Sequence, residues 1–205
     1  PGSRSLGEII AAEFEKGADS VMMENHGAVM CGATIAEAFT RFESLDYVAR
    51  IQINASGLGD LLHPQGEPKR TVWPEFEPIS ASPYECEMRD SIINFRARAY
   101  RQKLLFTGNA FLSARLADDD FIVTPTNFDP MDMNAADMVR IVNGKREAGK
   151  IPSSGSAFCR EIYRRCGWVN AIIMTRPPNA MAFASTGTRM DSRTIPESYI
   201  QLRDI

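Results

Sequence analysis

Residues 109–130, NAFLSARLADDDFIVTPTNFDP, carry the clearest structural pattern in this chain. Two segments rich in apolar residues, 112–116 and 121–124, are each long enough to form a short strand. The acidic triplet at 118–120 separates them, and polar residues of this kind favour a tight turn. The stretch therefore predicts two short strands joined as a hairpin.

The segments after this hairpin continue the pattern of short elements joined by turns. Apolar residues at 139–142 and 171–174 predict two more strands, and the second is expected to be buried. Between them, Ser153 or Ser154 is expected to cap a helix that ends near Arg165. The side chains expected to point inward from that helix are Phe158, Ile162 and Tyr163.

The segments before the hairpin supply helices and another pair of short strands. A long helix is predicted over 84–106, and its basic residues, Arg96 among them, are expected to form a solvated face. Nearer the N-terminus, an NHG turn at 25–27 separates two short strands. A helix follows over 35–53, with Thr34 as its expected N-cap and Glu37 completing a capping box. Helices and short strands mixed in this way predict an α/β (α+β) fold with a central, mostly antiparallel sheet flanked by helices.

The composition is that of an ordinary globular protein. The chain has 205 residues, 44% of them hydrophobic and 24% charged, which fits one domain or two small ones. A net charge of −3 gives no broad basic surface for nucleic acid. No apolar run approaches the roughly 20 residues that span a bilayer, and no signal peptide is expected. The four scattered cysteines are typical of free thiols, so we expect a cytoplasmic protein.

Several segments of the chain resemble one known family. NAFLSARL (109–116), FIVTPTNFDP (121–130), DMVRIVNGKREAG (137–149), IPSSGSAFCREIY (151–163) and VNAIIMTRPPNAMAFAS (169–185) resemble the N-terminal half of the class II aldolase/adducin domain. PGSRSLGEIIAAEF (1–14) and NHGAVMCGATIAEAF (25–39) resemble its C-terminal half. This family includes L-fuculose-phosphate aldolase and the non-enzymatic head of adducin. The resemblance implies the same α/β fold that the local patterns predict.

The two halves occur in the reverse of the family's order. Residues 1–56 resemble the C-terminal half, residues 84–205 resemble the N-terminal half, and the Pro- and Gly-rich stretch 57–83 reads as a linker between them. Two explanations are open. The chain is either part of a longer protein with tandem aldolase-like domains or a circular permutant whose halves fold together as one domain.

The resemblance implies a zinc site that this chain matches at one position. In the family, an HxH pair and the histidine of an NHG-type turn hold Zn²⁺, and a glutamate in a PSSE motif serves in acid–base chemistry. Met174 and Arg176 stand at the HxH positions here, and Gly155 stands at the glutamate position. Only His26 matches a metal ligand, and it is either a zinc ligand or a turn histidine bonded to backbone. No catalytic residue is therefore assigned.

The resemblance also implies an anion pocket, which holds phosphate in the family's sugar-phosphate enzymes. Short hydroxyl side chains and free N–H groups near a helix start suit an anion. The expected ligand is a sugar phosphate or another small anion, unless the serines act only as helix caps. The residues that match the pocket are Thr126, Asn127, Ser153, Ser154 and Asn109, the last displaced by an insertion at 110–111.

Two functions follow from the resemblance. The first is that of an aldehyde-lyase that cleaves sugar 1-phosphates by zinc-stabilised retro-aldol chemistry, with a site that is incomplete in this chain. The alternative is a catalytically inactive, adducin-like module for assembly or anion binding. Family members commonly form tetramers, so the resemblance also implies a homo-oligomer.

Overall fold

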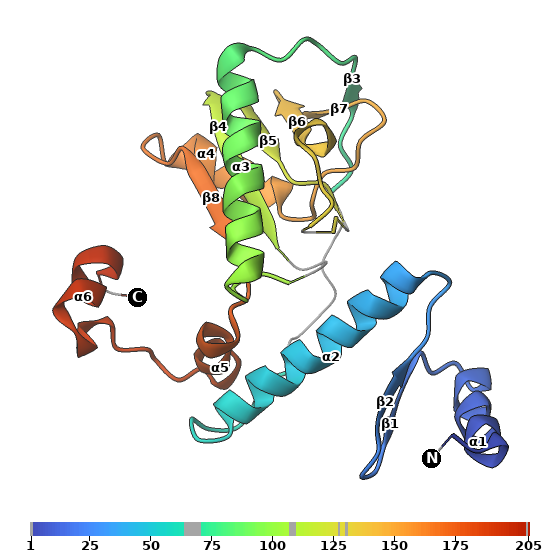
Figure 1. Cartoon of the computed structure of the whole chain (residues 1–205). Helices are drawn as coiled ribbons and strands as arrows, with labels where there is room; N and C mark the ends of the chain where they lie inside the picture. The colour runs from blue at the N-terminus through green and yellow to red at the C-terminus, as the bar shows by residue number, and fades with distance from the viewer. Residues whose placement is uncertain (1, 64–70, 107–109, 127, 130, 204) are drawn as a thin grey trace. The chain divides into compact units, whose positions relative to one another are not determined.

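The computed structural model describes residues 2–63, 71–106, 110–126, 128, 129, 131–203 and 205. The chain forms two compact units, Pro1–Ala49 and Arg50–Ile205, which we call unit 1 and unit 2. The boundary between them falls within a long helix, α2 (Ile35–Ala55). Figure 1 labels the elements, and each unit is described by itself below.

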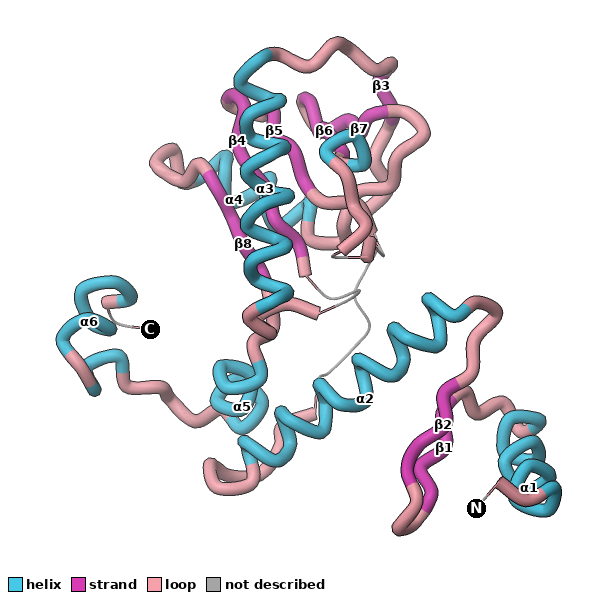
Figure 2. The backbone as a smooth tube through the Cα atoms, in the orientation of Figure 1, coloured by secondary structure: helices cyan, strands magenta, loops and turns pink. Residues whose placement is uncertain are grey.

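Unit 1 contains a helix, a hairpin and the first part of α2. The hairpin pairs its strands antiparallel, with Val21 opposite Val29 (Figure 2, magenta). Its turn places Asn25 and Gly27 at positive φ, 53° and 144°, where asparagine and glycine are the favoured residues. The predicted NHG turn is therefore confirmed. The elements before α2 are α1 (Arg4–Glu15), β1 (Ser20–Met23) and β2 (Gly27–Met30).

The start of α2 is fixed by a capping interaction that the sequence predicted. The Glu37 backbone N–H donates to the Thr34 hydroxyl at 3.1 Å. The Glu37 carboxylate reaches back and accepts from the Ala33 backbone N–H at 2.8 Å. The first bond satisfies a backbone donor that a helix start leaves without a partner, and the second ties the residue before Thr34 to the first turn, which explains why the helix begins here.

Unit 2 is built on a six-stranded sheet in the order β3-β7-β6-β5-β4-β8. The β3–β7 pair is parallel and every other neighbouring pair is antiparallel, which confirms the predicted fold class. The strands are β3 (Glu75–Phe76), β4 (Phe111–Ala117), β5 (Asp120–Val123), β6 (Val139–Val142), β7 (Lys145–Glu147) and β8 (Ala171–Met174). The helices are α3 (Pro83–Arg101), η1 (Ala135–Asp137), α4 (Ser156–Arg165), α5 (Pro178–Thr186), η2 (Ser192–Thr194) and α6 (Pro196–Leu202).

Helices cover both faces of this sheet, as Figure 1 shows for α3 and α4. Successive side chains of a strand point to opposite faces. On β5, Ile122 therefore packs in the cluster that contains Ile92 of α3, whereas Phe121 and Val123 pack in the cluster that contains Tyr163 of α4. The central strands are buried on both sides, and this makes the middle of the sheet the core of unit 2.

The face of α3 that packs on the sheet carries charges, so the expectation of a solvated basic face is wrong for Arg96, whereas Arg98, Arg101 and Lys103 are exposed as predicted. Arg96 is 3% exposed and Glu85 is 1% exposed. Glu85 accepts hydrogen bonds from the side chains of Arg89 and Arg140, each at 2.8 Å. Arg140 also donates to Asp120 at 2.9 Å. Because the Glu85 carboxylate has two guanidinium partners, α3 can bury it against the sheet.

Two helix boundaries differ from the predicted ones. Helix α3 ends at Arg101, before the predicted end at 106, because Lys103 adopts φ 59°, which ends a right-handed helix. Helix α4 begins at Ser156 with Gly155 as its N-cap and no side-chain cap. The prediction that Ser153 or Ser154 caps this helix was therefore wrong, and both serines lie in the preceding segment.

Two predictions of burial were also wrong. Phe158, which was predicted to point inward, is 55% exposed. The next residue on α4, Cys159, points inward and is fully buried. Strand β8 lies at an edge of the sheet and is only half-buried, with Ile173 60% exposed. Tyr163 is buried as predicted. Among the described residues, no helix is both long and apolar enough to cross a bilayer.

Candidate functional site

Two segments of unit 2 run side by side and bring three of the predicted pocket residues together. Pro125 and Pro152 form an isolated antiparallel bridge. On either side of it, the Thr126 N–H donates to the Ile151 carbonyl at 3.0 Å, and the Ser153 N–H donates to the Thr124 carbonyl at 3.1 Å. These backbone bonds fix Thr126 beside the serine pair.

Thr126, Ser153 and Ser154 line one pocket with a volume of about 270 Å³. Phosphate binding by these residues stays a prediction, and Asn109 and Asn127 lie outside the described residues. We call this cavity the hydroxyl pocket. Its other lining residues are Thr71, Val72, Trp73, Arg146, Ile151 and Pro152.

The hydroxyls of this pocket differ in how they are engaged. Ser153 is 8% exposed, and its hydroxyl accepts a long bond from the Gly155 N–H at 3.4 Å. Within the described part of the chain, the hydroxyls of Thr126 and Ser154 have no hydrogen-bond partner. Two hydroxyl donors are thus available to a ligand that enters the pocket.

Arg146 also lines this pocket, and the sequence did not predict it as a site residue. It lies on β7, and its backbone N–H donates to the Pro74 carbonyl at 2.8 Å. Its guanidinium forms an ion pair with Glu75 and donates to the Lys150 carbonyl. A three-residue strand leaves too short a pattern to predict from sequence; the turn at Asn143 and Gly144, which precedes it, was the available signal.

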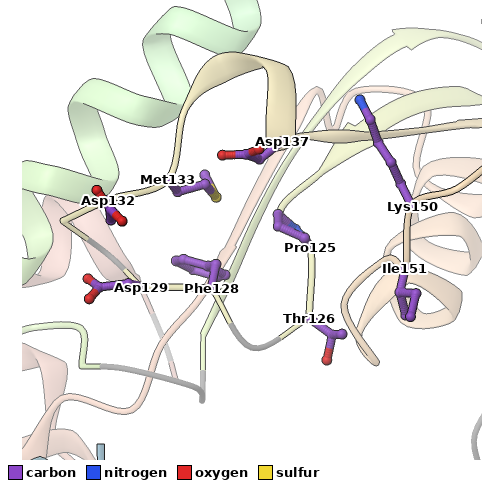
Figure 3. Close-up of a pocket in the computed structure, with 9 residues that line it drawn as sticks. All are labelled: Pro125, Thr126, Phe128, Asp129, Asp132, Met133, Asp137, Lys150 and Ile151. Carbon is purple, nitrogen blue, oxygen red and sulfur yellow. The ribbon is translucent and has the colours of Figure 1, made fainter. Parts of the chain in front are cut away.

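A second pocket of about 370 Å³ adjoins the first and shares Thr126 and Ile151 with it (Figure 3). Three aspartates line it, and two of them already serve the local backbone. Asp129 accepts from the Met131 N–H, and Asp137 accepts from the Asn134 N–H, each at 2.7 Å. This wall is acidic, so the hydroxyl pocket is the one that suits an anion.

An aromatic ring occupies the space at Gly155, the position of the family's glutamate. A Cβ atom built on Gly155 would lie 2.0 Å from Cε1 of Phe111. The ring of Phe111 also packs edge-on against Phe158, with the two centroids 6.1 Å apart. Phe111 lies opposite Met174 in the β4–β8 pair. An apolar group of side chains thus fills this part of the site.

The donor set of unit 2 does not fit the zinc ion that the resemblance implies. Gly155 has no side chain, and the guanidinium of Arg176 offers no lone pair to a metal. A thioether such as that of Met174 is a soft ligand and not one of the usual zinc donors. Cys159 is fully buried, and burial raises the pKa of its thiol to about 12. The thiol is therefore protonated at neutral pH and is a poor ligand or nucleophile.

His26 lies exposed on the β1–β2 turn in unit 1. Its backbone N–H donates to the Met23 carbonyl at 3.2 Å. Over the described residues, no group of three or more His, Cys, Asp and Glu side chains is arranged to hold a metal. A role for His26 as a zinc ligand stays a prediction, because it depends on ligands from other segments.

Comparison with solved structures finds similar proteins. YgbL from Escherichia coli is 18% identical, with a TM-score of 0.42, over 45% of this chain and 45% of that chain. YgbL from Klebsiella pneumoniae is 21% identical, with a TM-score of 0.43, over 45% of each chain. L-fuculose 1-phosphate aldolase from Glaciozyma antarctica PI12 is 16% identical, with a TM-score of 0.41, over 49% of this chain and 45% of that chain. The matches thus span less than half the length of these proteins.

A family comparison covers most of the chain. Residues 1–53 and 91–202 match the Class II Aldolase and Adducin N-terminal domain family. A search of the curated proteins found no significant match. The family match takes in the hairpin of unit 1, every strand of the unit 2 sheet except β3, and the hydroxyl pocket except for the segment 71–73. The chain therefore belongs to the class II aldolase and adducin N-terminal domain family.

Proposed function

We propose that this chain binds a small phosphate-bearing anion in the hydroxyl pocket and does not itself cleave a carbon–carbon bond. The observation that carries this proposal is the Phe111 ring, which takes the space that a side chain at position 155 would need. The chain can therefore keep a binding site without a catalytic one. The pocket hydroxyls remain, whereas the Phe111 ring fills the space that an acid–base side chain at position 155 would occupy.

The pocket has the groups that hold a phosphate. Thr126 and Ser154 have hydroxyls to donate, and Arg146 supplies a positive charge. Hydrogen bonds between such donors and an ionised oxygen are stronger than neutral ones. The volume of about 270 Å³ suits a small ligand. A sugar phosphate, the ligand class that the family resemblance implies, is therefore the proposed ligand.

The absence of aldol cleavage follows from the chemistry of the positions. A class II retro-aldol step needs a metal that stabilises an enediolate and a carboxylate that moves a proton. Within unit 2, Met174, Arg176 and Gly155 are the residues at the positions where the family resemblance implies those groups. None of the three can supply an imidazole ligand or a carboxylate.

The second candidate function is that of an aldehyde-lyase, and His26 favours it. This histidine stands at the ligand position of an NHG-type turn, so an HxH pair and a glutamate from segments outside this chain would complete a zinc site with it. Under this alternative, unit 1 contributes to catalysis and unit 2 does not.

The binding proposal is tested by calorimetric titration with glycerol phosphate. We expect Ser154→Ala to weaken binding about tenfold, because it removes one hydrogen bond to a charged oxygen. Ser80→Ala, which changes an exposed serine outside the pocket, is the control and should leave the affinity unchanged. Equal affinities for the two variants, or no binding by the unaltered chain, would contradict the proposal.

A further inference from the structure

The outer wall of the hydroxyl pocket comes from a segment that the family match does not include. Residues 54–90 lie between the two matched regions, and Thr71, Val72 and Trp73 of this stretch line the pocket. The next residues form β3, the edge strand beside β7. We call residues 71–76 the strap.

The strap is tied to β7 by backbone hydrogen bonds. The Arg146 N–H donates to the Pro74 carbonyl at 2.8 Å, and the Ala148 N–H donates to the Phe76 carbonyl at 3.0 Å. Trp73 packs against the core cluster on the α4 face of the sheet. This anchoring sets Glu75 opposite Arg146 in the parallel pair.

The register of the β3–β7 pair places the Glu75 carboxylate against the Arg146 guanidinium, which lines the pocket. The Glu75 carboxylate forms an ion pair with the Arg146 guanidinium. Among the described residues that line the hydroxyl pocket, Arg146 carries the only charge. The Glu75 side chain is 48% exposed and that of Arg146 is 23% exposed, so the pair is not sealed from solvent and its carboxylate can be exchanged.

We propose that Glu75 is an internal competitor for the anion pocket, holding the Arg146 guanidinium until a bound phosphate displaces its carboxylate. This inference rests on the proposed function, since it assumes that the hydroxyl pocket binds phosphate. It adds a residue that lowers the affinity of the pocket, in a segment that the family match leaves out.

The strap also favours anions that carry a carbon skeleton beside their phosphate group. Val72 and Trp73 of the strap, together with Ile151 and Pro152, add apolar lining to a pocket that also holds the hydroxyls and Arg146. A phosphate monoester can place its carbon skeleton against Trp73 while its phosphate meets the hydroxyls, whereas inorganic phosphate has no such group. The monoester should therefore bind more tightly than inorganic phosphate.

The test uses Trp73 as its own reporter. The chain has two tryptophans, and Trp168→Phe leaves Trp73 as the single fluorophore. In this background we compare Glu75→Gln with Glu77→Gln, which removes the same charge from an exposed neighbour that forms no ion pair among the described residues. Each protein is titrated with glycerol phosphate and with inorganic phosphate, and binding is followed by Trp73 fluorescence and by calorimetry.

We expect Glu75→Gln to bind glycerol phosphate about threefold more tightly than the parent, which is the scale of an exposed ion pair. Glu77→Gln should match the parent, and the thermal unfolding curves of the three should coincide. If the parent binds but Glu75→Gln binds equally or more weakly, the competitor role is wrong and the proposed function stands. If neither the parent nor Glu75→Gln binds either ligand, the proposed function is wrong, and so is the competitor role of Glu75.

Discussion

Steric contact with a neighbouring side chain restricts position 155 to glycine, whereas its backbone conformation does not. Its φ of −75° is open to any residue, yet a Cβ atom would meet the Phe111 ring at 2.0 Å. Phe111 is 5% exposed and cannot turn away without disturbing the core. The same contact therefore explains both the glycine and the absence of a carboxylate at this position.

Replacing Gly155 should thus cost stability. We expect Gly155→Ala to lower the free energy of unfolding by about 2 kcal/mol through overpacking, measured by urea denaturation. Gly167→Ala is the control, since a Cβ there meets open space. Phe111→Leu should relieve the clash, so the double variant should lose less than the sum of the two single losses. Additive losses would mean that the two residues do not share this space.

Asp119 gives the chain a pH-dependent contribution to stability. Its carboxylate accepts a hydrogen bond from Arg160 at 2.8 Å, and this bond lowers the pKa of Asp119 in the folded state. A lowered pKa stabilises the fold above the ordinary value of about 4, and the contribution is lost as the pH falls through the folded-state value.

Asp119→Asn should therefore destabilise the chain at pH 7 by up to about 1 kcal/mol and by less at pH 3. Urea denaturation at the two pH values measures the difference. A loss that is the same at both pH values would show that the ionised carboxylate contributes nothing.

At the residue scale, the sequence identified Thr126, Ser153 and Ser154 through family motifs, and the structure brings these three into one pocket. It did not identify Arg146 or Phe111 as site residues, because neither stands at a position to which the family motifs assign a role. Their positions depend on strand pairing, which sets residues of different segments side by side. A local pattern does not reveal such pairings.

At the element scale, most helices and strands were predictable because their patterns are local. Turn residues and the Thr34–Glu37 cap indicated where elements begin. The errors concern burial. Phe158 and β8 read as apolar and therefore inward, yet β8 is an edge strand and Phe158 lies on the outer part of α4. Which apolar residues are covered depends on the order of strands, which the sequence pattern leaves open.

The buried charges of α3 provide a test at this scale. Glu85→Gln should lower the free energy of unfolding by about 3 kcal/mol, because it leaves the guanidinium groups of Arg89 and Arg140 short of a carboxylate partner. Glu87→Gln, an exposed change on the same helix, should cost less than about 0.5 kcal/mol. Denaturation curves that do not separate the two variants would contradict the role of this network.

At the scale of the whole molecule, unit 2 leaves surface that a partner can cover. Strand β8 ends the sheet with an unpaired edge among the described strands, and its Ile173 is 60% exposed. Exposed edges and apolar surface of this kind favour association. This surface is consistent with the homo-oligomer that the family resemblance implies, and we propose that copies of the chain associate through it.

Light scattering should then report a mass above the 22.8 kDa of one chain. Ile173→Lys, which places a charge on the edge strand, should shift the protein toward the monomer. A monomeric unaltered chain over the micromolar range would contradict the association, and an oligomer that persists in Ile173→Lys would exclude β8 as its interface.

The proposed binding of a sugar phosphate without its cleavage is tested in one sample by ³¹P NMR of a ketose 1-phosphate. We predict that the phosphorus signal of the ketose broadens or shifts when the protein is added, and that no dihydroxyacetone phosphate signal grows with time, even with added Zn²⁺. The Ser154→Ala variant should weaken the broadening. Growth of a dihydroxyacetone phosphate signal would contradict the absence of cleavage, and a ketose signal unchanged by the protein would contradict the proposed binding.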